Sequence, residues 1–214
     1  MGTKLHSLLF ATDGSEFSAG AQRLAIALAK RCGARLTAMT IILSPQDLVG
    51  FGTHGLREQM EREAQALLAT VVAAAETEGV TCLTQLVYGD QPHQEIINTA
   101  LELEPDLIVL GRRGKRGLAR LMVGHATAHV AGLAPCPVLM VPRAAAMWSH
   151  RILLATDGSD QSQAATQVAL DLARDCQLPV TLISVTSRSH NTERKAEAQA
   201  ALDQTLAAMQ AVGI

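Results

Sequence analysis

The stretch HSLLFATDGSEFSAGAQRLAIALAKRCGARLTAMTII, residues 6–42, decides the fold because it predicts a strand, a helix and a second strand in turn. Residues 5–12 hold a short apolar run, which is typical of a buried strand. Apolar residues then recur at helical spacing from Ala21 to Cys32, and Gly33 follows where a helix commonly ends. Residues 36–43 form the second apolar run. This order favours a right-handed crossover between parallel strands.

The same pattern returns later in the chain as HRILLATDGSDQSQAATQVALDLARDCQLPVTLISVT, residues 150–186. The two stretches align without a gap at a constant offset of 144, and 14 of their 37 positions are identical. Identity at this level indicates a duplicated domain. The first copy runs to about residue 143, whereas the second stops at residue 214, about halfway through. We therefore predict a complete domain over 1–145 and an incomplete repeat over 146–214.

The remainder of the first copy also alternates between strand and helix patterns. A long helix ends at Gly79, and a glycine-containing loop precedes it. The later elements are expected at 80–87 (strand), 92–103 (helix), 107–110 (strand), from about 124 (helix) and 138–141 (strand). The second copy predicts strands at 151–156 and 180–185 and a helix over 192–212. The pattern indicates an α/β fold, a doubly wound parallel sheet with helices on both faces, followed by a partial repeat.

Composition excludes several classes of function. Aromatic residues make up 2% of the chain, too few for the stacking platforms that bind single-stranded nucleic acid. A formal charge of −2 also argues against non-specific binding to duplexes, so we expect no nucleic-acid partner. The four cysteines stand far apart, which predicts neither disulfides nor a zinc site. The sequence shows no signal peptide and no membrane-spanning run, and it predicts a cytoplasmic protein.

An electropositive glycine loop, GRRGKRGLARLMVGHAT at residues 111–127, follows the fourth predicted strand. Ligands of open parallel sheets bind beyond the carboxyl ends of the strands, where Gly111 lies. Gly124 opens the next helix, and the amides and dipole at a helix start favour an anion. The loop has neither the GxxxxGK[ST] nor the GxGxxG spacing. It therefore predicts either a phosphate cradle or a solvated turn whose glycines serve backbone geometry.

The spacing Gly111-x2-Gly114-x9-Gly124, with ATDGS after the first strand and APCPVLMVP at the fifth, strongly resembles the universal stress proteins. The resemblance covers residues 5–143 and, as a partial domain, 150–214. It implies strand order 3-2-1-4-5 and ATP binding, with Mg²⁺ or Mn²⁺ held mainly through the phosphates. It also implies that Asp13 and Ile41 contact the adenosine end. The residues expected around the nucleotide are Ala11, Thr12, Asp13, Ile41, Gly111, Arg112, Arg113, Gly114, Gly124, His125, Ala126 and Thr127.

The sequence departs from the family at His125, where the family usually has Ser or Thr. An imidazole can donate a hydrogen bond to phosphate, but its bulk can also crowd the cradle. Asp13 has two interpretations as well, a ligand contact or a turn and helix cap. For its repeat mate Asp157, which has no glycine loop beside it, the capping role is favoured. His125 and His129 lie one helical turn apart, but the sequence HATAH lacks the glutamate of a zinc-protease motif.

Two functional hypotheses from different classes follow. The first is a nucleotide-responsive stress regulator with no assigned catalytic residue and at most slow ATP hydrolysis. The second is a nucleotide-independent scaffold that dimerises and docks a protein partner. An adenylating pyrophosphatase is a third option, but its SGGxDS-type loop is absent, since ATDGS stands in that place. We also expect a homo-oligomer, most simply a dimer, because the strand at 151–156 would keep an uncovered edge. The family often pairs through its fifth strand, which offers a second contact.

Overall fold

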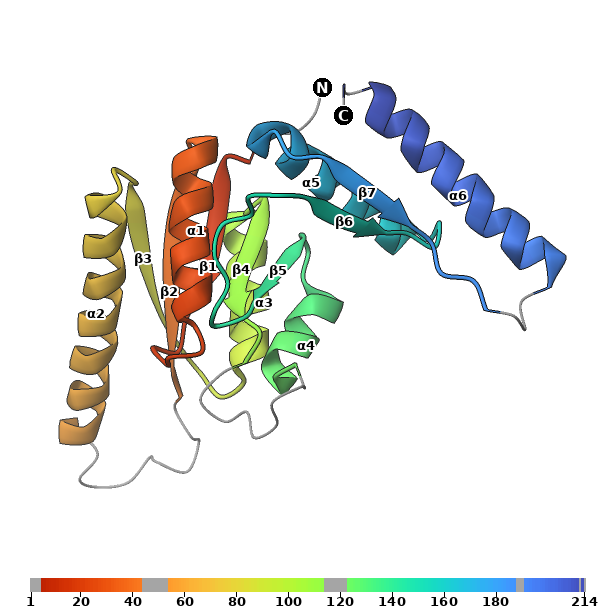
Figure 1. Cartoon of the computed structure of the whole chain (residues 1–214). Helices are drawn as coiled ribbons and strands as arrows, with labels where there is room; N and C mark the ends of the chain where they lie inside the picture. The colour runs from red at the N-terminus through yellow and green to blue at the C-terminus, as the bar shows by residue number, and fades with distance from the viewer. Residues whose placement is uncertain (1–4, 44–53, 114–122, 188–190, 212, 214) are drawn as a thin grey trace. The chain divides into compact units, whose positions relative to one another are not determined.

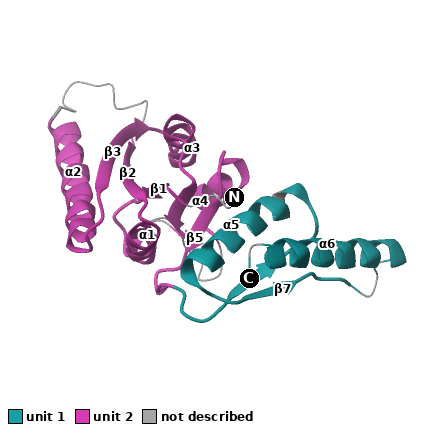
Figure 2. Cartoon of the chain, turned by 90° about the horizontal axis from the view of Figure 1, so that it is seen from above, with its two compact units in different colours: residues 1–4, 148–214 teal, residues 5–147 magenta. Residues whose placement is uncertain are grey.

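The computed structural model describes residues 5–43, 54–113, 123–187, 191–211 and 213 of the 214-residue chain. These residues form two compact units, 5–147 (magenta in Figure 2) and 148–214 (teal in Figure 2), called here, in chain order, the first unit and the second unit. Each unit has its own parallel sheet.

The first unit contains a five-stranded sheet in the order β3-β2-β1-β4-β5, and all four strand pairs are parallel. Its elements are β1 (Ser7–Ala11), α1 (Ala19–Cys32), β2 (Arg35–Leu43), α2 (His54–Thr77), β3 (Cys82–Gly89), α3 (Pro92–Leu103), β4 (Leu107–Gly111), α4 (His125–Leu133) and β5 (Val138–Val141). The α/β class and the strand order predicted from the sequence are confirmed.

Helices cover both faces of this sheet (Figure 1). α1 and α2 contact one another, as do α3 and α4. The central strand β1 is therefore buried on both faces: Leu8, Leu9 and Phe10 are all 0% exposed. On the α3 and α4 face, Leu9 packs in a cluster with Met39, Ile108 and Val130. A strand buried on both faces reads as a continuous apolar run, which is the pattern that residues 5–12 show.

The strand order reverses beside β1, and this reversal positions the site. β1 pairs with β2 on one side and with β4 on the other, with Ala11 in register with both Met39 and Leu110. The connection after β1 passes through α1 to β2, whereas the chain reaches β4 on the opposite side only after β3 and α3. The loops leaving β1 and β4 therefore diverge at the carboxyl edge, which opens a crevice between them.

The second unit contains β6 (Ile152–Ala155), α5 (Asp160–Cys176), β7 (Val180–Ile183) and α6 (Thr192–Ala211). β6 and β7 form a two-stranded parallel sheet. α6 takes the part that α2 has in the first unit: a Cβ on Gly158 would meet Ala201 of α6, as one on its repeat mate Gly14 would meet Leu67 of α2. The elements agree with the sequence prediction, although both strands are shorter than predicted.

One face of the second unit's sheet is bare. The repeat mate of Leu9 is Leu153, which is 65% exposed, whereas Leu9 is 0% exposed. Val185, just after β7, is the mate of Ile41 and is 78% exposed. In the first unit the corresponding face is covered by α3 and α4, and among the described residues of the second unit there is no counterpart to these two helices. No described helix of either unit is long and apolar enough to span a membrane.

Candidate functional site

A cavity of about 610 Å³ opens at the carboxyl edge of the first unit's sheet, where the strand order reverses. Its walls come from the ends of β1, β2 and β4, from the segment after β3, and from the start of α4. Met39, Ile41 and Leu43 of β2 supply an apolar wall on one side. A cavity of this size and lining suits a small organic ligand with a few polar groups.

Most of the residues predicted around the nucleotide line this one cavity. They are Ala11, Thr12, Asp13, Ile41, Gly111, Arg113, Gly124, His125, Ala126 and Thr127. Arg112 is not among the lining residues, and its backbone N–H donates instead to the Val141 carbonyl at 2.9 Å. Gly114 lies outside the described residues. The structure thus brings together residues that lie more than a hundred positions apart in the sequence.

Gly111 is glycine because two loops approach it closely. A Cβ at this position would lie 2.9 Å from the Phe17 carbonyl oxygen and 3.0 Å from that of Arg113. The Thr127 hydroxyl donates to the Gly111 carbonyl at 3.1 Å and so ties the first turn of α4 to the end of β4. The close packing at Gly111 and the Thr127 hydrogen bond hold the loop backbone beside the cavity, where the backbone can approach a ligand.

Gly124 is the N-cap of α4, as predicted, with extended φ and ψ of −62° and 145°. No side chain caps this helix start, and the Gly124 N–H donates to the Arg112 carbonyl at 2.9 Å. A Cβ on Gly124 would be in ordinary van der Waals contact, 3.4 Å from the nearest atom. The fold therefore does not require glycine at this position. The local effect of having no side chain here is that a ligand can reach the N–H groups at the start of α4.

The turn after β1 is held by a chain of hydroxyl groups. The Ser18 hydroxyl donates to the Ser15 carbonyl at 2.8 Å, so the Thr12 hydroxyl, 2.9 Å away, is the donor to Ser18. The Gly14 N–H donates to the Thr12 oxygen at 3.1 Å. Asp13 Oδ1 accepts from the Ser15 N–H at 3.0 Å, which is an Asx turn.

The second unit repeats these bonds. The Thr156 and Ser162 hydroxyls lie 3.1 Å apart, and the Gly158 N–H donates to Thr156 at 3.2 Å. Asp157 Oδ1 accepts from the Ser159 N–H at 3.0 Å and from the Ser159 hydroxyl at 2.6 Å, and these bonds lower the pKa of Asp157 to about 2. Ser159 is the N-cap of α5. The ATDGS turn is thus a structural unit in both copies, and any ligand contact by Asp13 comes in addition to it.

The sequence analysis missed the segment after β3. Asp90, Gln91, Pro92 and His93 line the cavity, and α3 begins at Pro92. The same rule that singled out Gly111 applies to them, because they too follow the carboxyl end of a parallel strand. The order of elements carried this signal, but the set of residues predicted around the nucleotide did not include these four.

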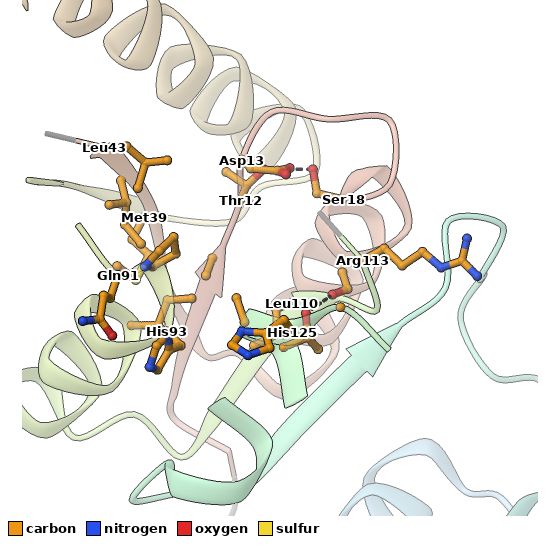
Figure 3. Close-up of a pocket in the computed structure, with 18 of the residues that line it drawn as sticks. Thr12, Asp13, Ser18, Met39, Leu43, Gln91, His93, Leu110, Arg113 and His125 are labelled. Carbon is orange, nitrogen blue, oxygen red and sulfur yellow. Dashed lines mark hydrogen bonds between the residues drawn. The ribbon is translucent and has the colours of Figure 1, made fainter. Parts of the chain in front are cut away.

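The positive charge that the sequence places in the glycine loop lies only partly within the described residues. Lys115, Arg116 and Arg120 lie outside the described residues. Arg113 lines the cavity, but its guanidinium extends away from His93 and His125 (Figure 3). The imidazoles of His93 and His125 also line the cavity, where Figure 3 shows them next to one another.

Sequence comparison matches the universal stress protein family over residues 4–142 and again over residues 149–212. The chain belongs to this family. The universal stress protein MJ0531 of Methanocaldococcus jannaschii is 36% identical over 141 residues, which are 64% of this chain and 81% of that protein. YxiE of Bacillus subtilis is 32% identical over 146 residues, which are 64% of this chain and 98% of that universal stress protein. The recognition of the family from the glycine spacing is confirmed.

Solved structures extend the comparison to the fold. A universal stress protein from Archaeoglobus fulgidus superposes over 96% of this chain and 75% of its own, with a TM-score of 0.74 and 19% identity. A universal stress protein solved in complex with cAMP covers 66% of this chain and 100% of its own, with a TM-score of 0.53 and 25% identity. The likeness in fold therefore extends to both units of this chain.

Proposed function

We propose that the first unit of this universal stress protein binds an adenine nucleotide, ATP foremost, and that the chain is a nucleotide-responsive regulator in the stress response. One observation carries the proposal: the predicted residues from β1, β2, β4 and α4 line a single cavity at the switch point of the sheet. The complex of a family member with cAMP supports a ligand of this class.

In the proposed complex the apolar wall of Met39, Ile41 and Leu43 receives the base. Asp13 also lines the cavity, and its carboxylate can accept hydrogen bonds from ribose hydroxyls. Phosphates lie against the loop backbone at Gly111 and the uncapped start of α4, because the N–H groups that follow Gly124 in the first turn of the helix can donate to an anion.

A divalent ion would enter with the nucleotide. Among the described residues no group of three His, Cys, Asp or Glu side chains could hold a metal. Mg²⁺ or Mn²⁺ would therefore take its ligands chiefly from phosphate oxygens and water, as Mg²⁺ commonly does. We assign no catalytic residue, and we expect hydrolysis to be slow at most.

Calorimetry on nucleotide-free protein tests the proposal. We expect saturable binding of ATP in the presence of Mg²⁺. The Gly124→Val variant should weaken binding by about 100-fold or more, ~2.8 kcal/mol, because the branched side chain enters the phosphate site. Gly132→Val is the matched control, since Gly132 lies on the same helix with open space around it. Absence of heat at millimolar ATP would contradict the proposal.

The second candidate function is a nucleotide-independent scaffold, and the bare sheet face of the second unit favours it. Leu153 and Val185 are exposed in the second unit. Their repeat mates in the first unit, Leu9 and Ile41, lie on the face of the sheet that α3 and α4 cover. In both candidates we propose a homodimer in the cytoplasm, with no nucleic-acid partner. An intact fold and dimer that bind no nucleotide would favour the scaffold.

A further inference from the structure

Three histidines from two helices meet at one side of the cavity. His93 lies at the start of α3, His125 is the first residue of α4, and His129 follows one turn later. The ring centroids of His125 and His129 are 4.1 Å apart, those of His93 and His129 are 4.8 Å apart, and those of His93 and His125 are 6.5 Å apart. We call these residues the histidine cluster.

Two members of the histidine cluster face the cavity. His93 and His125 both line it and lie side by side in Figure 3. His129 contacts both rings, and its Nδ1 lies 2.9 Å from the His125 carbonyl oxygen. This arrangement makes His129 a positioning residue for the two rings that a ligand would meet.

The formal charge of the cavity depends on these rings. Among the described residues, the other ionisable side chains of its lining are those of Asp13, Asp90 and Arg113, which together carry −1. Protonation of His93 and His125 changes the formal charge of this described lining to +1. Besides His125 and His129, α4 carries no ionisable side chain, and the nearest one on α3 is Glu95, which lies against Gly89. Protonation of the two imidazoles thus changes the formal charge of the described lining from negative to positive.

Both helices also begin at the cavity. The N-caps Gln91 of α3 and Gly124 of α4 make no side-chain capping bond, and each is a lining residue. The first N–H groups and the positive dipole end of each helix favour negative charge there. Two helix starts and two titratable rings therefore converge on the same part of the cavity.

We propose that the histidine cluster is a proton-dependent anion subsite that receives a phosphate group of the bound nucleotide. The inference rests on the proposed nucleotide function and adds a regulatory property to it. A protonated imidazole donates from both nitrogens and attracts phosphate, so binding takes up protons from solution. Affinity should therefore rise as the pH falls through the ordinary range of histidine, about 6.5.

Calorimetry of the full chain at about pH 6 and about pH 8, on either side of the ordinary histidine pKa, tests this linkage. We expect ATP to bind more tightly at the lower pH, by up to about tenfold for each unit by which binding raises the pKa of an imidazole. Adenosine has no phosphate, so its affinity should not change. In buffers of different ionisation enthalpy, ATP should show proton uptake and adenosine none.

Variants locate the effect. The double variant His93→Gln, His125→Gln keeps hydrogen-bond donors but cannot be protonated in this range, so ATP affinity should lose its pH dependence. His129→Gln should reduce the dependence in part. His150→Gln is the matched control, because His150 is an exposed histidine of the second unit. An unchanged pH profile in the double variant would overturn the inference.

Failure of the inference and failure of the proposed function give different results. ATP binding that is equally tight at both pH values overturns the proton-linked subsite and leaves the nucleotide function standing. If ATP fails to bind at any pH, pyrophosphate followed by the histidine ring proton signals in NMR decides the inference alone. A rise in the titration midpoints of His93 and His125 with pyrophosphate supports the subsite, and unchanged midpoints overturn it.

Discussion

The first helix of each copy ends in the same left-handed backbone conformation, but the residue at that position differs between the copies. Gly33 ends α1 with φ of 65°, and its repeat mate Gln177 ends α5 with φ of 53°. Both are in the left-handed region, where a Cβ meets the neighbouring carbonyl and costs roughly 1–2 kcal/mol. Glycine relieves this strain. The first copy therefore has the residue that its helix end favours, and the second does not.

We predict that Gln177→Gly stabilises the second unit by roughly 0.5–1 kcal/mol, the strain relief being partly offset by greater freedom of the unfolded chain. Gln204→Gly, at an exposed position inside α6, is the control and should destabilise by about 1 kcal/mol. Urea unfolding followed by the fluorescence of Trp148, the one tryptophan of the sequence, measures both. Equal destabilisation by the two substitutions would contradict the left-handed strain argument.

A second single-residue effect is the contribution of Asp157 to the pH dependence of stability. Donation from Ser159 lowers the pKa of Asp157 to about 2, below the ordinary value of about 3.9. A lowered carboxyl pKa stabilises the fold above the unfolded value, and this contribution is lost as the pH falls from about 4 to about 2. We predict that Ser159→Ala moves the titration of the Asp157 carboxyl carbon, followed by NMR, back toward the ordinary range. A midpoint that stays at about 2 would refute the assignment of cause.

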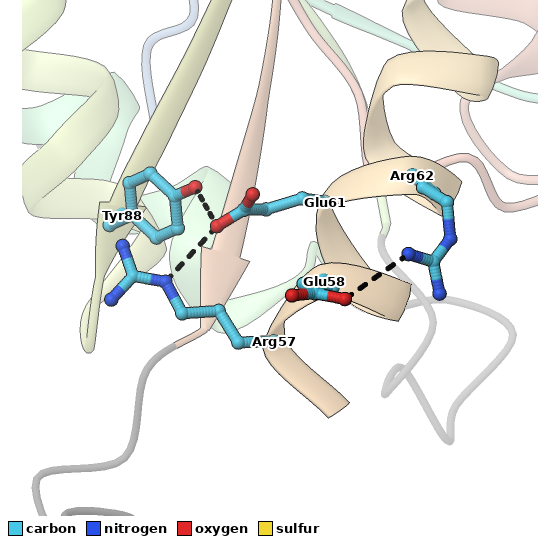
Figure 4. A network of polar contacts seen from close by, with 5 residues as sticks. All are labelled: Arg57, Glu58, Glu61, Arg62 and Tyr88. Atoms are coloured by element: carbon cyan, nitrogen blue, oxygen red, sulfur yellow. Dashed lines mark hydrogen bonds and ion pairs between the residues drawn. The ribbon is translucent and has the colours of Figure 1, made fainter. Parts of the chain in front are cut away.

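At the scale of elements, a polar network joins the start of α2 to the end of β3 (Figure 4). The Tyr88 hydroxyl donates to Glu61 at 2.6 Å, and Arg57 Nε donates to the same oxygen at 3.0 Å. The Arg57 guanidinium also lies 4.9 Å from the centre of the Tyr88 ring. The hydrogen bond to Glu61 raises the pKa of Tyr88, and Arg57 offsets part of the rise.

Tyr88 is the one tyrosine of the sequence, so an alkaline absorbance titration reports this network directly. We predict a midpoint above the ordinary value of about 10 and a lower midpoint in Glu61→Gln, because the amide no longer holds the hydroxyl proton as strongly. Glu58→Gln is the control, since Glu58 pairs with Arg62 and not with Tyr88. A midpoint that moves equally in both variants would contradict the assigned contact.

Element types were predictable from the sequence because periodicity reports burial. The apolar runs of β1 and β4 and the helical spacing of α1 each carry that signal. The glycine spacing also identified the residues that line the cavity from β4 and α4. His93 could not be identified in this way, because its role depends on α3 and α4 lying together, a contact between helices that are separated by a strand.

Strand length in the second unit was predicted poorly for a related reason. β6 ends at Ala155 as β1 ends at its mate Ala11, but β7 ends at Ile183, the mate of Met39, whereas β2 continues to Leu43. The last four residues of β2 pair with β3, whereas β7 pairs with β6 alone among the described strands. The apolar pattern of the sequence predicts where a strand can form, but the length of the strand also depends on how many neighbouring strands it can pair with.

At the scale of the whole molecule, the bare face of the second unit predicts self-association. The same apolar face is present on every copy, so a two-fold axis can bring like faces together. We predict a dimer that Leu153→Glu weakens by at least about tenfold, because the change places a charge in the apolar contact. Leu133→Glu is the matched control, since Leu133 is 62% exposed on α4 of the first unit.

Light scattering across a concentration series measures this association. A wild-type chain that stays monomeric at high micromolar concentration would contradict the dimer. A dimer that resists Leu153→Glu would instead point to the β5 edge, which has one strand neighbour in the sheet.

The central position of β1 has a consequence for synthesis. Leu8 pairs with Leu36 on one side and with Leu107 on the other, so the second pairing waits for about seventy more residues. Pairings between distant segments form late. Until β4 leaves the ribosome, nascent β1 therefore exposes the kind of open edge that β6 has in the two-stranded sheet of the described second unit. A ribosome stalled before residue 107 would display an aggregation-prone chain, whereas one that has released Val141 from its exit tunnel would display the complete five-stranded sheet.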